Sequence, residues 1–395
     1  RSRYRGPRGK VTDMDNDPVV IVGAGPVGVL AALQLARQGR QVLLIEARPQ
    51  HAEIRDRRTL ALSFNSVAAF QQAGVVLPEE ETTPIVNVHI SQQNMFGRTL
   101  LRAEDMGVAA LGRTVDYALL MRACEAALAA QNVPVLWHTQ VAQVRTLSHF
   151  AELQIEQQGR AHSLTADWVV LAEGGHLAEG LPGLQCHSYD YQQSALVTTL
   201  EFEQGNNGTA YERFADAGPF ALLPYHHAYR LVWTRTPADA LSLKNMPFED
   251  FAAAFEAAFG NHLGRLKARG EAAVFPLQLK QLNKVYSGRV ICIGNAAQTM
   301  HPVAAQGLNL GVRDALALAA CFAAAKSLNN NALAQQYAAG RRPDAQAIVG
   351  FTHSLVTLFD HPDALLKLGR GGVMALLDSL PAARKKFTRQ LIFGL

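Results

Sequence analysis

The sequence predicts an α/β protein in which a parallel sheet is interleaved with a mostly antiparallel sheet, followed by a helical C-terminus. Three observations predict this class. Residues 18–46 alternate strand, glycine-rich turn, helix and strand, whereas residues 181–285 carry several strand-like runs and only one clear helix. Helical patterns dominate after residue 330. Alternating strands and helices are typical of parallel sheets, and successive strands without helices favour antiparallel pairing.

Composition excludes some classes of function. The chain has 395 residues, of which 49% are hydrophobic and 18% charged, as expected of a globular protein with a large core. The net charge is +4, and subtracting the five basic residues among the first ten leaves −1. A nearly neutral body argues against nucleic acid as the main partner.

Residues 1–17 are expected to be a disordered leader, because they are basic and contain no apolar run. The same lack of an apolar run argues against a secretory signal. The four cysteines have neither C-x-x-C nor metal-type spacing, which favours reduced thiols and a cytoplasmic compartment. The longest apolar run, 315–325, is too short to span a membrane.

The first element is a strand at 19–22 that enters the pattern G-x-G-x-x-G. Gly23 makes the turn, Gly25 lets a pyrophosphate approach the backbone, and Gly28 lets helix and strand touch. A second strand at 41–45 ends at Glu46, which would accept hydrogen bonds from ribose hydroxyls. This spacing predicts a dinucleotide site; the alternative is a tight turn beside a solvated glutamate.

A second small-residue segment extends from Gly294 to Asp314, between a strand-like run at 289–293 and a helical pattern at 315–325. Gly294 permits a tight turn, and Gly307 and Gly311 supply unusual backbone angles or close packing. A strand, a turn and a loop that leads into a helix commonly bind a phosphate or the polar arm of a cofactor.

This segment resembles the second flavin fingerprint of single-component aromatic hydroxylases, G-D-A-A-H-x-x-x-P-x-x-G-Q-G-x-N-x-G-x-x-D. Asn295 replaces the family's Asp, and Ala305 replaces a Gly. Over nearly the whole chain the resemblance is closest to the 2-octaprenyl-6-methoxyphenol hydroxylases, flavin monooxygenases of ubiquinone biosynthesis. It implies a Rossmann-like FAD-binding domain. The second-fingerprint residues that it assigns to FAD are Gly294, Asn295, Ala305, Gln306, Gly307 and Asn309.

The resemblance implies three further contacts to FAD. Residues 56–63 are similar to the family's D-x-R-x-x-A-L, which would place Arg58 near the flavin; the alternative is an arginine on a solvated loop. Arg122, on a helix predicted over 119–130, would contact the cofactor or be an ordinary surface residue. Glu173 stands where the family has an Asp that closes over the pyrophosphate, and its extra methylene alters its reach.

The family takes electrons from NADPH or NADH and uses O2 to hydroxylate an aromatic ring, with water excluded from the site. The resemblance places His301 and Pro302 against the flavin ring, where His301 acts as a general base or shapes the loop. The implied substrate is a prenylated phenol. Candidate substrate contacts on the antiparallel sheet are Tyr211, Phe220 and Leu222.

No metal site is predicted. His226 and His227 are neighbours that would point to opposite sides of a strand, so a hairpin turn is favoured over a metal pair.

Strands are expected at 195–202, 209–214, 220–224 and 229–233, with a helix at 248–259. The expected domains are 18–84, 106–180 and 286–330 for FAD, 85–105 and 181–285 for substrate, and 331–395 as a helical segment.

Two alternatives to a hydroxylase remain at this stage. One is another FAD-dependent oxidoreductase, such as a halogenase or a polyprenyl reductase. The other is a catalytically weak flavin-binding scaffold in a ubiquinone-biosynthesis complex, an idea that rests on Glu173 and Ala305.

Residues 382–395 form a basic amphipathic pattern. Such an end either docks on the protein's own core or makes peripheral contact with the inner membrane or a partner.

Overall fold

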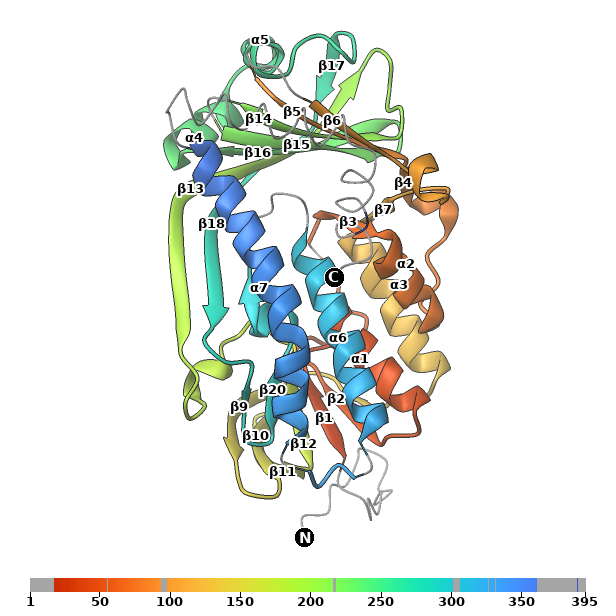
Figure 1. The fold of residues 1–395 in the computed structure, drawn as a ribbon, viewed down its shortest axis with the longest axis vertical. Coiled ribbons are helices and arrows are strands. Elements are labelled where there is room, and N and C mark those ends of the chain that lie inside the picture. Colours follow the sequence, from red (N-terminus) through yellow and green to blue (C-terminus); the bar gives the residue numbers. More distant parts are fainter. Residues whose placement is uncertain are drawn as a thin grey trace.

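Two large sheets stacked along the long axis organise the chain (Figure 1). The computed structural model describes residues 18–54, 56–93, 98–215, 218–300, 306–325, 327–330, 332–360 and 389. One sheet is almost entirely parallel and the other almost entirely antiparallel. The predicted fold class is therefore confirmed.

The parallel sheet has six strands, and all pairs except β19–β20 run parallel. Its order is β19 (Tyr286–Ser287), β20 (Val290–Cys292), β12 (Trp168–Leu171), β1 (Val19–Val22), β2 (Val42–Ile45) and β8 (Val135–Leu136). The central strands are buried on both faces, which explains why their sequences are continuous apolar runs instead of alternating ones.

Helices cover one face of the parallel sheet. They are α1 (Pro26–Arg37), α2 (Phe64–Gln72), α3 (Tyr117–Ala130) and α6 (Gln306–Ala324). Their apolar sides pack on alternate strand residues such as Ile21, Leu44 and Val170. The other face is covered by a small antiparallel sheet of β9 (Thr139–Thr146), β10 (Ala151–Gln157) and β11 (Arg160–Ala166). The cofactor-binding fingerprints are therefore anchored in a core buried on both sides.

The second sheet has nine strands, and only the β14–β5 pair is parallel. Its order is β21 (Gln298–Thr299), β18 (Ala273–Leu282), β13 (Cys186–Phe202), β16 (Ala228–Arg235), β15 (Gly218–Tyr225), β14 (Thr209–Ala215), β5 (Asn87–Gln92) and β6 (Arg98–Arg102), with β17 (Leu266–Arg269) paired to β13. Two helices, α4 (Pro237–Asn245) and α5 (Phe248–Phe259), lie against one face over an aromatic core.

A fourth sheet, of three strands, connects the two larger ones. It consists of β3 (Thr59–Ser63), β7 (Gly112–Asp116) and β4 (Thr83–Ile85). The short turns are η1 (Glu79–Glu81), η2 (Glu104–Met106), η3 (Ala178–Gly180) and η4 (Gly294–Ala296). The last described helix, α7 (Leu333–Asp360), runs beside α6 from the parallel sheet towards the antiparallel one (Figure 1).

Three expectations about elements need correction. Strand β13 begins at Cys186 instead of Ala195, and α4 was not expected at all. Helix α6 begins at Gln306, so Gly307 and Gly311 lie inside the helix and neither has a positive φ. Small and polar residues obscure the helical period there, because periodicity depends on contrast between apolar and polar positions.

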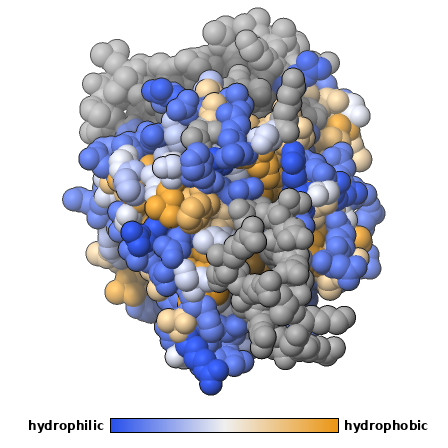
Figure 2. Space-filling model, turned by 90° about the horizontal axis from the view of Figure 1, so that it is seen from below, coloured by the Kyte–Doolittle hydropathy of each residue, from blue (hydrophilic) through white to orange (hydrophobic). Residues whose placement is uncertain are grey.

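Helix α6 is long and apolar enough to cross a membrane by length and composition, although its apolar run appeared too short in the sequence. Half of that apolar window is buried inside the protein, and α6 packs against both α1 and α7. We therefore interpret it as a core helix. The end of the molecule shown in Figure 2 has hydrophilic side chains interspersed with small apolar areas on its described part, as protein surfaces generally do.

Candidate cofactor site

Three glycine-containing turns meet at the carboxyl ends of neighbouring strands. Strands β1, β12 and β20 are adjacent and parallel. They lead into turns at 23–25, 173–175 and 294–296, which we call the cofactor turns. Open α/β sheets bind ligands at the carboxyl ends of their parallel strands. The two sequence fingerprints, separated widely in the chain, are thus brought together with Glu173 between them.

Glycine is required where these turns touch. Gly23 has φ +100°, and a Cβ on it would lie 2.9 Å from the backbone nitrogen of Glu173. A Cβ on Gly28 would lie 2.0 Å from the carbonyl oxygen of Gly23. A Cβ on Gly175, which has φ +98°, would lie 3.5 Å from the carbonyl oxygen of Asn295. Side chains at the first two positions would force the turn away from its neighbours.

Gly25 differs from these glycines. It precedes α1 with φ −70°, and a Cβ on it would meet no heavy atom within 4 Å. Neither the backbone angle nor protein packing therefore requires glycine there. The space next to it adjoins the N-terminus of α1, which has no side-chain cap and no acidic residue in its first turn. A helix N-terminus of this kind favours an anion such as a pyrophosphate.

Glu46 follows β2 and reaches back to the first cofactor turn. Its Oε2 accepts a hydrogen bond from the Ala24 N–H at 2.7 Å, and its Oε1 accepts one from the Arg48 N–H at 2.9 Å. The side chain retains 15% exposure. The predicted acid is therefore held beside the glycine turn.

Glu173 has one carboxylate oxygen in use and one without a partner. Oε2 accepts hydrogen bonds from the N–H groups of Gly175 at 2.9 Å and His176 at 3.2 Å. Oε1 is buried, and no described residue donates to it. A buried oxygen without a donor is costly, so the site fits a ligand that carries hydroxyl groups. The additional methylene lets this side chain fold back onto its own turn.

Val27 of α1 packs against the second fingerprint. Gly294 has φ +57°, and a Cβ there would lie 3.2 Å from Val27 Cγ1. On α6, a Cβ at Gly311 would lie 2.7 Å from Val27 Cγ2. Gly311 is therefore needed for close packing and not for an unusual backbone angle. The Asn295 side chain is exposed at the same turn.

Asn309 joins α6 to β3. Its Oδ1 accepts a hydrogen bond from the Ser63 N–H at 2.9 Å, and its Nδ2 donates to the Ala61 carbonyl at 3.0 Å. Gln306 is buried and accepts a 3.4 Å hydrogen bond from Arg313. Gly307 is exposed, with no heavy atom near its Cβ direction. Asn309 thus positions backbone, and cofactor contact by these three residues stays a prediction.

Arg58 forms an ion pair with Asp56, with 2.6 Å between Nη2 and Oδ2. The hydrogen bond to Asp56 raises the pKa of the Arg58 guanidinium, so its charge persists. The guanidinium also lies 5.6 Å from the centre of the Tyr117 ring, and the side chain is 58% exposed. Arg122 is exposed on α3. The flavin contacts expected of Arg58 and Arg122 stay predictions, as do those of His301, Pro302 and Ala305, which lie outside the described residues.

The three predicted substrate residues lie on the outer face of the antiparallel sheet, the face under α5. Phe220 is 1% exposed and Leu222 is fully buried, and both belong to the core with α5. Tyr211 pairs with Leu222 in register and packs edge-to-face on Phe259. This placement corrects the expectation that Phe220 and Leu222 contact substrate, because α5 already fills the space beside them.

The opposite, inner face of this sheet is only partly covered. Strand side chains alternate between faces, so the neighbours of the buried core residues point the other way. We define the inner face by half-buried residues of β13, β15 and β16, namely Val197, Thr199, Ala221, Leu223, Arg230 and Val232. Arg230 donates to Thr59 Oγ1 of β3 at 2.9 Å and to Thr199 Oγ1 at 2.7 Å. The inner face therefore lies towards β3 and the FAD fingerprints.

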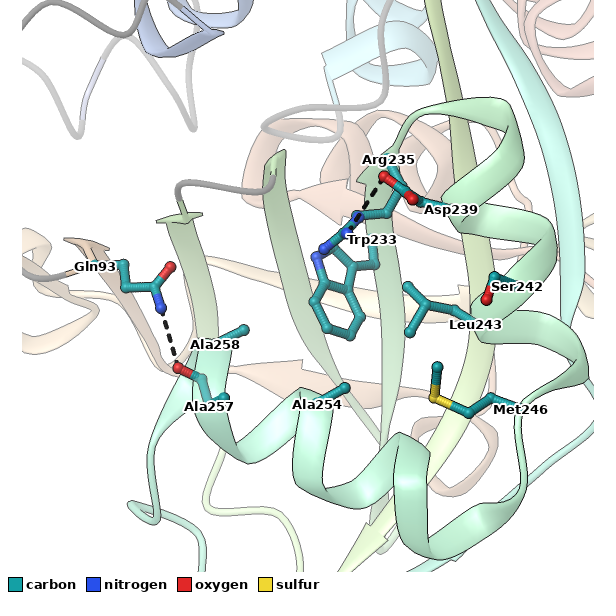
Figure 3. A pocket seen from close by; sticks show the side chains of 10 residues that line it. All are labelled: Gln93, Trp233, Arg235, Asp239, Ser242, Leu243, Met246, Ala254, Ala257 and Ala258. Atoms are coloured by element: carbon teal, nitrogen blue, oxygen red, sulfur yellow. Dashed lines mark hydrogen bonds and ion pairs between the residues drawn. The ribbon is translucent and has the colours of Figure 1, made fainter.

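A pocket of about 380 Å³ lies between α4 and α5, on the outer side of the sheet (Figure 3). Trp233 lines it beside the Arg235–Asp239 ion pair. The Nε1 of Trp233 and the Nε of Arg235 are buried, and neither has a hydrogen-bond partner among the described residues. Since the cofactor turns and the inner face lie elsewhere, this pocket is not the cofactor site.

Among the described residues, no group of three or more His, Cys, Asp or Glu side chains could hold a metal ion. His226 and His227 form the turn between β15 and β16, and His226 has φ +50°.

The sequence profile of a family described as FAD binding domain matches residues 16–352. The chain belongs to this FAD-binding family. The cofactor turns fit the assignment: Gly25 leaves room for a pyrophosphate, and the unpartnered Oε1 of Glu173 can accept a hydrogen bond from an FAD hydroxyl.

Curated relatives match nearly the whole chain. "Ubiquinone hydroxylase UbiL" of Rhodospirillum rubrum is 31% identical over 94% of this chain and 88% of its own length. "Ubiquinone biosynthesis monooxygenase COQ6, mitochondrial" of Drosophila melanogaster is 24% identical over 98% of this chain and 91% of its own length. The crystal structure of p-nitrophenol 4-monooxygenase PnpA from Pseudomonas putida shares the fold, with a TM-score of 0.75 and 16% sequence identity. The match covers 94% of this chain and 96% of PnpA.

Proposed function

We propose that this chain is an FAD-dependent monooxygenase that hydroxylates the aromatic ring of a prenylated phenol in ubiquinone biosynthesis. The observation that carries the FAD assignment is the convergence of the three cofactor turns, with free space at Gly25. Full-length similarity to proteins named as ubiquinone hydroxylases supports the substrate class and the reaction.

When bound, FAD supplies the redox chemistry. The chain supplies binding and orientation. The N-terminus of α1 would face the pyrophosphate, and Glu46 and Glu173 would accept hydrogen bonds from hydroxyl groups of the cofactor. The turn that begins at Gly294 would receive the part of FAD that carries the ring. We infer these roles from the positions of the three cofactor turns.

We assign the substrate wall to the inner face. Val197 pairs with Val232 in register, and Val232 pairs with Ala221, so three apolar side chains form one row across β13, β16 and β15. An apolar wall suits a prenylated ring and helps to exclude water from the reacting atoms. The Arg230–Thr59 hydrogen bond fixes this wall relative to β3, and Asn309 fixes β3 relative to α6.

Three finer predictions belong to this proposal. Electrons come from NADPH or NADH. The chain works in the cytoplasm with peripheral contact to the inner membrane, and it associates with a ubiquinone-biosynthesis complex. The membrane contact rests on residues 382–395, of which Arg389 alone is described, so it stays a prediction.

Substrate-stimulated turnover tests the proposal. With purified FAD-loaded protein, a short-chain prenylated phenol is expected to increase oxidation of NADPH or NADH at least about tenfold, as in enzymes whose substrate binding assembles the reactive site. Oxygen uptake should match phenol hydroxylated. The measurements are absorbance at the nicotinamide band, an oxygen electrode and chromatography of the phenol. The matched control is the same prenyl chain carried on an alcohol without an aromatic ring.

Other outcomes identify the alternatives. Saturation of prenyl double bonds without oxygen uptake would indicate a polyprenyl reductase. A halide requirement with a halogenated ring would indicate a halogenase. Stable FAD binding with no turnover of either nicotinamide would indicate a scaffold.

A further inference from the structure

Four charged side chains form a buried cluster between α6 and α7. Asp314 and Arg313 belong to α6, and Arg341 and Asp344 belong to α7. Arg341 Nε donates to Asp314 Oδ1 at 2.8 Å, and Arg341 Nη1 forms a short contact with Asp344 Oδ2. Arg313 Nη1 donates to Asp344 Oδ1 at 2.8 Å. Two acids and two bases balance, so the cluster carries no net charge.

The second oxygen of Asp314 contacts the first residue of the third cofactor turn and the first residue of β21, which follows that turn. Oδ2 accepts the Gly294 N–H at 3.0 Å and the Gln298 side-chain amide at 2.9 Å. Gly294 and Asn295, the residue after it, are among those that the resemblance to the flavin fingerprint assigns to FAD. Asp314 is 2% exposed, so its charge depends on neighbouring groups and not on water.

Arg341 is the base that contacts Asp314 directly. Burial raises the pKa of the Asp314 carboxyl, and Arg341 and the Gly294 N–H oppose that effect. Burial also disfavours the charged form of Arg341, but the carboxylates of Asp314 and Asp344 outweigh it and raise its pKa. Removing the arginine would leave a buried carboxylate without a countercharge, which is strongly unfavourable.

We propose that Arg341, oriented by Asp344, is a positioning residue for FAD: through Asp314 it fixes the Gly294–Gln298 turn in the shape that receives the cofactor. Arg341 lies on a helix outside both fingerprints and acts through another side chain. The inference goes beyond the proposed function, because it concerns FAD affinity and is independent of which ring is oxidised.

The test uses FAD titration of the apoprotein, followed by flavin fluorescence, beside its melting temperature. Arg341→Met is expected to raise the Kd for FAD at least about tenfold, since losing the partner of a buried charge costs more than the 1.4 kcal/mol that corresponds to tenfold. The double variant Arg341→Met with Asp314→Asn removes the charge and keeps an oxygen for the Gly294 N–H. It should recover to within about threefold of the original Kd, because the two residues are directly coupled.

Two further variants keep the test decisive. Arg341→Lys retains the charge but loses the two-pronged geometry, so it should give an intermediate Kd even if the methionine variant does not fold. Arg40→Met is the matched control: Arg40 donates to the carbonyl oxygens of Phe322 and Ala325 at the far end of α6. It should lower the melting temperature without changing the Kd.

The proposal is overturned if Arg341→Met lowers the melting temperature but leaves the Kd for FAD unchanged. It is also overturned if the double variant binds FAD no better than Arg341→Met. Either result would make the cluster a packing element only. Failure of phenol hydroxylation in the unmodified protein would count against the proposed function and would leave these affinities interpretable.

Discussion

Gly25→Val is expected to yield colourless protein that folds normally. A Cβ there would meet no protein atom within 4 Å, so the apoprotein should tolerate valine, whose side chain would occupy the space assigned to the pyrophosphate. Overpacking a tight contact costs about 1–3 kcal/mol or more, which corresponds to a roughly 5- to 150-fold loss of FAD affinity. Flavin absorbance after gel filtration, together with the melting temperature of the apoprotein, measures both parts of this prediction.

Two other glycines provide controls. Gly28→Ala should damage the fold, because its Cβ would lie 2.0 Å from the Gly23 carbonyl oxygen. Gly350→Val places the same side chain as the Gly25 variant in open space on α7 and should retain FAD. A Gly25→Val protein with full yellow colour and unchanged FAD affinity would contradict the assignment of the pyrophosphate to this turn.

Val232→Glu is expected to abolish most hydroxylation while leaving FAD bound. Val232 is the middle of the apolar row on the inner face, so a carboxylate there would have to lose water before a prenylated ring could bind. Burying an unpaired charge costs several kcal/mol, so kcat/KM should fall on the order of 100-fold or more. The measurement is kcat/KM for the phenol, with FAD content per protein measured alongside.

Neighbouring and remote positions separate substrate contact from stability. Phe220→Ala, on the outer face, should lower the free energy of unfolding by about 3–5 kcal/mol through the cavity it leaves. Its effect on kcat/KM should be smaller than that of Val232→Glu. Val76→Glu introduces the same carboxylate at a position that is 73% exposed and should change neither quantity. Unchanged kcat/KM in Val232→Glu would place the substrate away from the inner face.

Local spacing made the first fingerprint predictable. Gly23, Gly28 and Glu46 lie within one strand–helix–strand unit, and their steric and hydrogen-bonding roles follow from that unit alone. The structure adds that a Cβ at Gly25 would meet no protein atom within 4 Å, which separates a glycine needed for a ligand from one needed for the fold. A sequence pattern treats these glycines alike.

The orientation of the substrate sheet was not predictable in the same way. Alternation identifies two sets of side chains on β15, but it does not say which set faces the cofactor, because both sets contain apolar residues. Phe220 and Leu222 pack in the core with the aromatic residues of α5. Ala221 and Leu223 of β15 lie on the inner face instead.

The link between Asp314 and Arg341 depends on tertiary packing. Asp314 ends the second fingerprint, but its partner lies on the next long helix, and no local spacing connects them. A trace of the link is visible at Arg341 and Asp344, which are charged residues three apart that become buried on α7. Only the packing of α7 on α6 shows which acid of the fingerprint they serve.

Oxygen-isotope labelling tests the proposed function most directly. FAD-loaded protein is supplied with reduced nicotinamide, a prenylated phenol and ¹⁸O2 in ordinary water, and the product is examined by mass spectrometry. A monooxygenase places one atom of O2 in the ring hydroxyl and reduces the other to water, so the account predicts one ¹⁸O atom per hydroxylated ring. A product without ¹⁸O, or oxidation of the nicotinamide with no change in the phenol, would contradict it.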